Sequence, residues 1–328
     1  MTNLTTTYMG LQLKSPVVLA ASTLSEHLVR VRQAEAAGAG AVVLRSLFEE
    51  QITSNPQEMR VLLQEASSVR KIWASPAAQT ISPGPEAYVE WANRVREILT
   101  IPVIASLNAA TPGAWTEFAH QLEDAGVNGL ELNIYRIPNN PVEAASTIED
   151  NTVEIVHSVC AKVRIPVAVK LGPFYTSLGH LANRLKEAGA TALVLFNRFL
   201  QPDIDSSAEE IVSELEFSTP SEIKLPLRWT ALLYDRIGMD IALTTGVHAG
   251  RDVVKALLAG ATVVQVASVL YRRGIDEIRT LNAGLTAWME AKGYTSLEEF
   301  RGKLSQARHP GVHELERAHY VKLLLAQT

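Results

Sequence analysis

The chain has 328 residues, of which 47% are hydrophobic, and its 30 basic and 35 acidic side chains leave a formal net charge of −5. A mildly acidic chain with no run of lysine or arginine lacks the basic surface that binds nucleic acid. The single cysteine, Cys160, excludes an intramolecular disulfide and a cysteine zinc site, and it favours a reducing, cytoplasmic compartment. We find neither a signal-peptide pattern nor an apolar run of the roughly 20 residues that cross a bilayer, so we expect no membrane partner.

Eight short apolar runs predict buried parallel strands. Four of them follow a helical segment that ends in Ala-Gly or Gly-Ala, within residues 35–45, 123–133, 187–197 and 258–268. The other four lie at residues 16–21, 101–106, 165–171 and 240–245. A glycine at the end of a helix supplies the left-handed conformation, and a strand covered on both faces needs a continuous apolar run.

Helical patterns separate these strands, for example at residues 115–123, 153–163, 178–188 and 252–258. Strands alternating with helices predict an α/β fold, and eight such units predict a (β/α)8 TIM barrel formed by a single domain, residues 1–328. A doubly wound open sheet is the alternative. Two long connections, 46–100 and 198–238, leave the carboxyl ends of strands and should lie over the barrel mouth, and a C-terminal helical tail covers 276–292 and 314–325.

Polar residues at the carboxyl ends of barrel strands point into the active site, and Lys170 is the most informative of them. Its ammonium ends an apolar strand, where burial without a partner costs several kcal/mol. It could form a Schiff base, or it could stabilise negative charge on an electron-accepting ring. The alternative is a structural ion pair with Glu131, but we expect Glu131 to point outward while Asn133 and Lys170 point inward.

The other strand ends predict a ligand site. Asn133 and Asn197 carry amides, which suit a planar heterocycle, although either could simply close a turn. The small residues that end the last two strands predict a phosphate site, or ordinary loops; they are Thr245 and Gly246, then Ala267 and Ser268. The eight histidines form no metal-ligand motif, so no metal is expected, and Cys160 is expected to be a packing residue.

In this order and spacing, three stretches resemble the FMN-dependent dihydroorotate dehydrogenases: 122–133, Val167-Ala-Val-Lys-Leu171 and 258–266. The resemblance covers nearly the whole chain. It implies an FMN-dependent dehydrogenase of pyrimidine biosynthesis that acts on CH–CH bonds, with Lys170 near the part of the ring that becomes negative on reduction. It also implies that the flavin is lined by Ala20, Ala21, Ser22, Arg45, Ser46 and Ser106, with the phosphate at Thr245, Gly246, Ala267 and Ser268.

The chain departs from the family pattern in the loop after the fourth strand. The family places a catalytic cysteine or serine there, in N-x-S-C-P-N or its serine form, whereas this chain has Asn133-Ile-Tyr-Arg-Ile-Pro-Asn139. Arginine at position 136 cannot accept a proton at neutral pH. The family's asparagine-rich substrate loop is also missing from residues 65–85. The cofactor site is therefore expected to be kept and the substrate chemistry altered, with Asn133, Arg136, Asn139 and Asn197 contacting the substrate.

These observations leave three hypotheses. The first is an FMN oxidoreductase that acts on a small molecule, which could be a carboxylate, and passes electrons to a soluble acceptor. This enzyme could be a homodimer. The second is a flavin-binding protein without turnover, which acts in electron transfer or regulation. The third is a Schiff-base aldolase that uses Lys170; it predicts a colourless protein in which borohydride traps the substrate.

Overall fold

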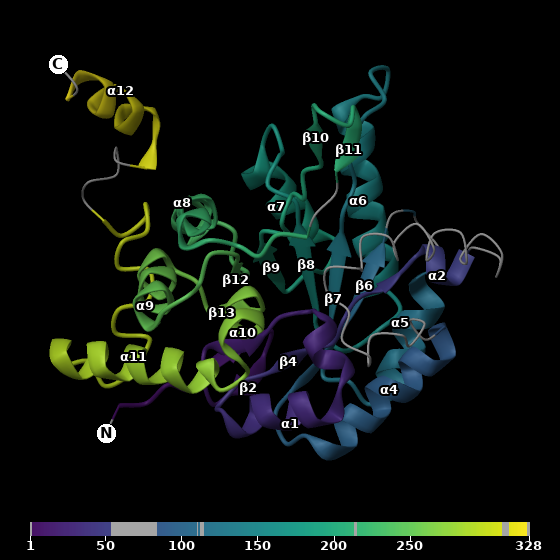
Figure 1. Ribbon diagram of the computed structural model, residues 1–328, viewed down its shortest axis with the longest axis horizontal. Helices are drawn as coiled ribbons and strands as arrows, with labels where there is room; N and C mark the ends of the chain where they lie inside the picture. Colours follow the sequence, from purple (N-terminus) through teal and green to yellow (C-terminus); the bar gives the residue numbers. More distant parts are fainter. Residues whose placement is uncertain are drawn as a thin grey trace.

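The computed structural model describes residues 2–53, 84–109, 111, 115–212, 215–309 and 315–326. In these residues eight parallel strands form a closed barrel (Figure 1). They are β3 (Val17–Leu19), β4 (Val42–Val43), β6 (Val103–Ala109), β7 (Gly129–Ile134), β8 (Val167–Leu171), β9 (Ala192–Leu195), β12 (Asp240–Thr244) and β13 (Val263–Val266). The last strand pairs with the first through Val264 and Val17, and β4 pairs with β6, so the ring closes. The predicted TIM barrel is confirmed, and the open sheet is excluded.

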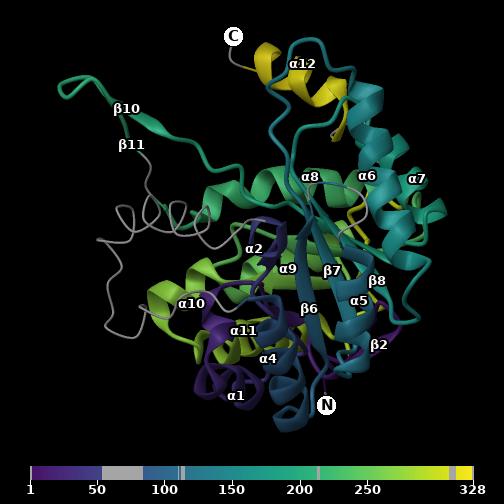
Figure 2. The same cartoon turned by 90° about the vertical axis from the view of Figure 1, so that its right-hand side faces the viewer.

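Helices between the strands cover the outside of the barrel (Figures 1 and 2). They are α1 (Leu28–Ala36), α4 (Pro85–Ile98), α5 (Trp115–Asp124), α6 (Ala145–Cys160), α7 (Leu178–Glu187), α8 (Lys224–Leu233), α9 (Gly250–Ala259) and α10 (Ser268–Arg273). Their buried aliphatic faces pack on the outward side chains of the strands, such as Leu130, Leu132 and Val169. This layer forms the larger of two apolar clusters.

The second apolar cluster fills the inside of the barrel with small side chains such as Ala168, Ala192 and Ala242. A hairpin of β1 (Thr6–Tyr8) and β2 (Leu11–Leu13) closes the amino end of the barrel. Met9, at its tip, donates its backbone N–H to Asp240 Oδ2 at 2.8 Å, and Asp240 is the first residue of β12. The carboxyl ends of the strands lie at the opposite end of the barrel.

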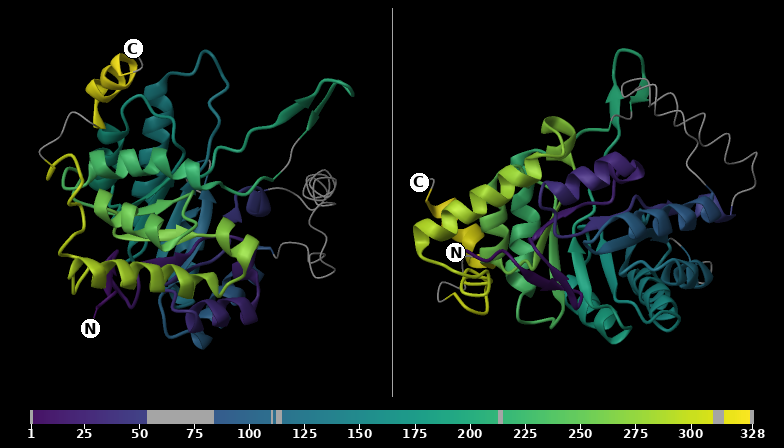
Figure 3. Two further views of the ribbon diagram at one scale, coloured as in Figure 1. Left: turned by 60° about the vertical axis from the view of Figure 1, so that its left-hand side comes forward. Right: turned by 90° about the horizontal axis from the view of Figure 1, so that it is seen from below.

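The first long connection holds β5 (Leu47–Phe48), which pairs with β6, and α2 (Glu50–Thr53); residues 54–83 of it lie outside the described part. The second holds a hairpin of β10 (Asp203–Asp205) and β11 (Glu210–Val212) and a short helix, η3 (Pro220–Ile223). This hairpin projects from the carboxyl end of the barrel, away from the body (Figures 2 and 3). Each connection ends in an ordinary barrel helix, α4 or α8, so less of its length extends past the strands than the sequence indicated.

The predicted helical tail is present as α11 (Glu277–Lys292) and α12 (Arg317–Leu325), and a short helix, η1 (Thr23–Glu26), follows β3. Helix α11 crosses the start of α9 at two glycines, where a Cβ built on Gly250 would lie 2.6 Å from the Cα atom of Gly284. Helix α12 buries none of its residues and lies at the edge of the molecule (Figure 1). Among the described residues, no helix combines the length and apolarity needed to span a membrane.

Candidate active site

Lys170 lies inside the barrel near the carboxyl end of β8, with only 7% of its surface exposed. Its Nζ atom is 3.6 Å from Oε1 of Glu131, a residue of β7 that is 1% exposed. The expectation that Glu131 points outward is therefore wrong. Glu131 and Asn133 are two positions apart in one strand, so both point to the same face, and here that face is the barrel interior.

The two predicted asparagines meet at this end of the barrel. Asn197 donates from Nδ2 to Oδ1 of Asn133 at 2.9 Å. Asn133 is also the register partner of Lys170 on the neighbouring strand, so both side chains leave the sheet at the same level. Lys170, Asn133 and Asn197 thus form one polar group at the ends of β7, β8 and β9.

On the other side of the barrel the predicted ring-lining residues other than Arg45 are small. Ala20 is buried, and Ser22 turns its hydroxyl back onto the carbonyl oxygen of Ala20 at 3.1 Å. The buried hydroxyls of Ser46 and Ser106 are 2.8 Å apart, which joins the ends of two neighbouring strands. Arg45 forms an ion pair with Glu26. In the described residues no hydrogen bond or ion pair joins Arg45 to the group around Lys170.

The predicted phosphate residues lie at the ends of β12 and β13. Thr245 and Gly246 both have φ of +79°, and a β-branched residue in this left-handed region is unusual and typical of functional sites. A Cβ on Gly246 would lie 2.2 Å from the backbone nitrogen of Ile223, so only glycine lets η3 approach this loop. Ala267 and Ser268 start α10 on the neighbouring strand end.

Ser218 joins these two loops, and the sequence analysis missed it. Its backbone N–H donates to Oγ of Ser268 at 3.1 Å, and its own Oγ accepts from the N–H of Gly246 at 3.4 Å. Its hydroxyl is also 3.2 Å from Nε2 of His248. The Thr219-Pro-Ser-Glu222 segment that follows forms a capping box, and that pattern is the signal in the sequence that could have located this turn.

His248 adds a titratable group behind the predicted phosphate site. Burial lowers the pKa of its imidazole, and the positive charge of Arg272 lowers it further. Asp252 holds the loop in place, since its Oδ2 accepts from the backbone N–H groups of His248 and Ala249 at 3.1 and 3.0 Å. A neutral imidazole is therefore fixed next to the Ser218 hydroxyl.

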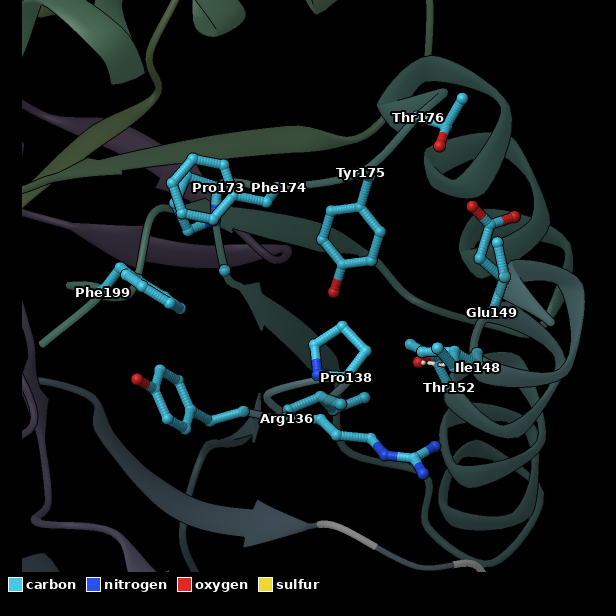
Figure 4. Close-up of a pocket in the computed structure, with 14 residues that line it drawn as sticks. Arg136, Pro138, Ile148, Glu149, Thr152, Pro173, Phe174, Tyr175, Thr176 and Phe199 are labelled. Atoms are coloured by element: carbon cyan, nitrogen blue, oxygen red, sulfur yellow. Dashed lines mark hydrogen bonds between the residues drawn. The ribbon is translucent and has the colours of Figure 1, made fainter. Parts of the chain in front are cut away.

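Arg136 and Asn139 lie farther out than the sequence analysis assumed. Arg136 pairs with Glu143 at 2.8 Å in its own loop, and Asn139 is exposed. In the described part of the chain neither contacts Asn133, Asn197 or Lys170 through a hydrogen bond or ion pair. The Arg136 guanidinium instead points toward α6 (Figure 4).

Arg136 belongs to a pocket of about 220 Å³ between the loops that follow β7 and β8. Aromatic rings line much of it, and Phe174 and Phe199 meet edge to face at 5.1 Å. The Tyr175 hydroxyl points into the pocket (Figure 4), and burial, helped by the charge of Glu149, raises the pKa of this phenol to about 12. Tyr175 therefore stays neutral and can donate a hydrogen bond.

The described residues contain no cluster of histidine, cysteine, aspartate and glutamate that could hold a metal ion. Cys160 ends α6, and burial raises the pKa of its thiol to about 11. A thiol with this pKa is a packing group and a poor nucleophile.

A family model described as "Dihydroorotate dehydrogenase" matches residues 3–289. The chain belongs to the dihydroorotate dehydrogenase family. It is 26% identical over 306 residues to the catalytic subunit of dihydroorotate dehydrogenase B (NAD(+)) from Thermoplasma volcanium, covering 92% of this chain and 98% of that one. It is 28% identical over 309 residues to the subunit of the same name from Methanothermobacter thermautotrophicus, covering 91% and 97%.

Among solved structures, the chain is similar to the dihydroorotate dehydrogenase of Eimeria tenella in complex with ferulenol. The TM-score is 0.67 at 16% identity, and the match covers 91% of this chain and 88% of that one. This likeness supports the barrel fold. The family match makes the chain a flavin-dependent oxidoreductase that resembles dihydroorotate dehydrogenase. Such an enzyme acts on CH–CH bonds of a small molecule and uses an electron acceptor.

Proposed function

We propose that residues 1–328 form one FMN-binding domain and that the chain is an FMN-dependent oxidoreductase with an acidic small-molecule substrate. The observation that supports this most is the Lys170 ammonium, which is buried at the end of β8 beside Asn133 and Asn197. Hydroxyl and backbone N–H groups, hydrogen-bonded to one another, gather at the neighbouring ends of β12 and β13. A ring that gains negative charge on reduction, with a phosphate at its far end, matches both groups.

The described residues fit such a group. Lys170 makes no hydrogen bond in the described part of the chain and faces Glu131 Oε1 only at 3.6 Å, so its ammonium still has N–H donors to offer a ligand. Most of the residues opposite it are alanines and serines, whose short side chains suit the close approach of a flat ring. We assign the ring to Ala20, Ala21, Ser22, Arg45, Ser46 and Ser106, and the phosphate to Ser218, Thr245, Gly246, Ala267 and Ser268.

When bound, FMN supplies the acceptor for a hydride taken from the substrate. Lys170 stabilises the negative charge that results, because a fixed ammonium in a water-poor site acts strongly on developing charge. Asn133 and Asn197, held together by their hydrogen bond, orient the substrate ring. Arg136 and Asn139 contact its carboxylate from the outer loop.

The arginine at position 136, where the family has a catalytic cysteine or serine, limits which substrate the enzyme can oxidise. Removal of a hydride from one carbon needs a base for the proton on the next carbon, and an arginine cannot act as that base. We therefore infer that dihydroorotate is at best a slow substrate and that a related acid is the physiological one. We place the protein in the cytoplasm, as a homodimer with a soluble electron acceptor. Sedimentation at two protein concentrations tests the oligomeric state.

The experiment is purification followed by anaerobic mixing. The protein should be yellow and should release FMN, identified by its phosphate, when denatured. Dihydroorotate should bleach the flavin slowly or not at all, and fast bleaching would defeat the inference drawn from Arg136. A colourless protein in which borohydride traps an aldehyde or ketone on Lys170 would favour a Schiff-base aldolase instead.

The pairing of Arg136 with Glu143 favours one second candidate, a flavin-binding protein that transfers electrons or regulates a partner without turnover of its own. With its guanidinium neutralised, the outer loop offers no free charge to a substrate. A screen of dihydropyrimidines and related acids separates the two, since any rapid reductant of the flavin rejects this candidate.

A further inference from the structure

A buried carboxylate lies directly below the candidate flavin site. Glu131 occupies the inward-facing position of β7 that precedes Asn133, on the side of the closed end of the barrel. Among the described residues it is the only carboxylate within 4 Å of the Lys170 ammonium. Both side chains are more than nine-tenths buried, so water screens their interaction little.

The barrel holds this carboxylate from the opposite wall. Gln265, in the apolar strand β13, donates from Nε2 to Oε2 of Glu131 at 2.6 Å. The other oxygen, Oε1, has no hydrogen-bond partner in the described residues and faces Lys170. Burial raises the pKa of the nearby Tyr8 phenol well above its ordinary value, and the charge of Glu131 raises it further, so this phenol adds no charge.

We propose that Glu131 is a positioning residue that acts through Lys170: it fixes the ammonium below the flavin and, as its counter-charge, lowers the electron affinity of that flavin. The inference rests on the proposed function for the flavin itself. Lys170 and Glu131 together carry no net charge, whereas Lys170 alone would carry one positive charge in a poorly screened interior. Negative charge on the ring is stabilised less by the neutral pair than by a bare ammonium.

Sulfite measures this effect without substrate turnover. It adds through its sulfur lone pair to an oxidised flavin, nothing leaves, and the ring is left with negative charge. At pH 6, Glu131→Gln should bind sulfite tighter by on the order of tenfold, the effect of removing one unit charge several ångströms away. Glu131→Asp keeps the charge and should stay within about threefold of the wild type.

Two further variants separate the counter-charge from simple damage to the barrel. Asp240→Asn removes another carboxylate of the barrel, at its closed end, and should leave sulfite affinity unchanged. Gln265→Leu keeps the Glu131 carboxylate but removes its hydrogen bond. The sulfite affinity of this variant should therefore lie between those of the wild type and Glu131→Gln.

Stability gives a readout that needs no flavin. Lys170→Met and Glu131→Gln each leave one buried charge unpaired, so the double variant should melt at a higher temperature than either single variant. If Glu131→Gln does not fold, Glu131→Asp and Gln265→Leu still carry the test.

The results separate this inference from the proposed function. Equal or weaker sulfite binding by Glu131→Gln, or a double variant that melts no higher than the singles, overturns the role of Glu131. If the protein is yellow but gives either of these results, the proposed flavin site stands and only the role of Glu131 is rejected. A protein that never binds FMN rejects the proposed function, and the melting comparison then still decides whether Glu131 fixes Lys170.

Discussion

Replacing Gly250 with alanine tests the close contact between α9 and α11. Gly250 is the first residue of α9 and is buried against α11. A Cβ at this position would lie 2.6 Å from Cα and 2.8 Å from the carbonyl carbon of Gly284, and 3.1 Å from the carbonyl oxygen of Leu281. Carbon atoms in contact prefer ~3.5–4.0 Å, so the two helices must separate by about 1 Å.

This separation should be costly. Overpacking of this kind costs about 1–3 kcal/mol. Alanine gains at most ~1 kcal/mol of helix propensity over glycine, and less at the first turn than in a helix interior. We therefore expect Gly250→Ala to lower the free energy of unfolding by about 1–3 kcal/mol, which corresponds to a melting temperature lower by about 2–10 °C. Thermal and urea unfolding, followed by circular dichroism, measure both quantities.

Gly179 provides the matched control. It is also a helical glycine, in α7, but a Cβ there would meet only the Leu233 methyl at 3.8 Å, an ordinary contact. Gly179→Ala should leave stability unchanged or raise it by up to ~1 kcal/mol. If Gly250→Ala is as stable as Gly179→Ala, α9 and α11 are not packed as closely as the structure places them.

Three further predictions concern the candidate site. Ser218→Ala leaves Gly246 and His248 without a buried partner, so FMN should bind about tenfold more weakly, which is a loss of ~1.4 kcal/mol in a fluorescence titration; unchanged affinity would remove Ser218 from the site. Burial lowers the pKa of His248 below the 6.5 of a free imidazole, so the unfolded chain binds more protons there and stability falls as the pH drops below that value. His248→Gln should flatten this part of a urea-midpoint profile between about pH 5 and 8, and an unaltered slope would contradict the shift. Asn197→Leu should raise the KM of whichever substrate reduces the flavin, and an effect on kcat alone would argue against an orienting role.

The barrel itself could be predicted from the sequence because its signal is local and repeated. Every predicted strand appears as a strand, since a short continuous apolar run between helical patterns is typical of a parallel strand covered on both faces. The long connections were harder to predict. Helices α4 and α8 lie at their ends, where no Ala-Gly phrase marks them as barrel helices.

The interior of the site shows where the sequence analysis failed. Lys170 was recognised because a charge in an apolar strand is conspicuous, and Gln265 in Val-Val-Gln-Val carries the same signal but was passed over. Glu131 was placed on the wrong face, although its spacing of two from Asn133 puts both on one side. Ser218 could not be assigned, because no local pattern shows which strand ends a distant turn will join. The roles of these residues toward a flavin stay predictions.

Tyr8 and Met9 fill the amino end of the barrel, and this has a kinetic consequence. For a flavin held at the opposite end, the reductant and the electron acceptor must use a single entrance and therefore alternate. Initial rates measured at several fixed acceptor concentrations should give parallel double-reciprocal lines, the pattern of a double-displacement mechanism. An excess of either reactant should inhibit the other half of the cycle, because the bound reactant occupies the shared entrance and prevents the second one from binding.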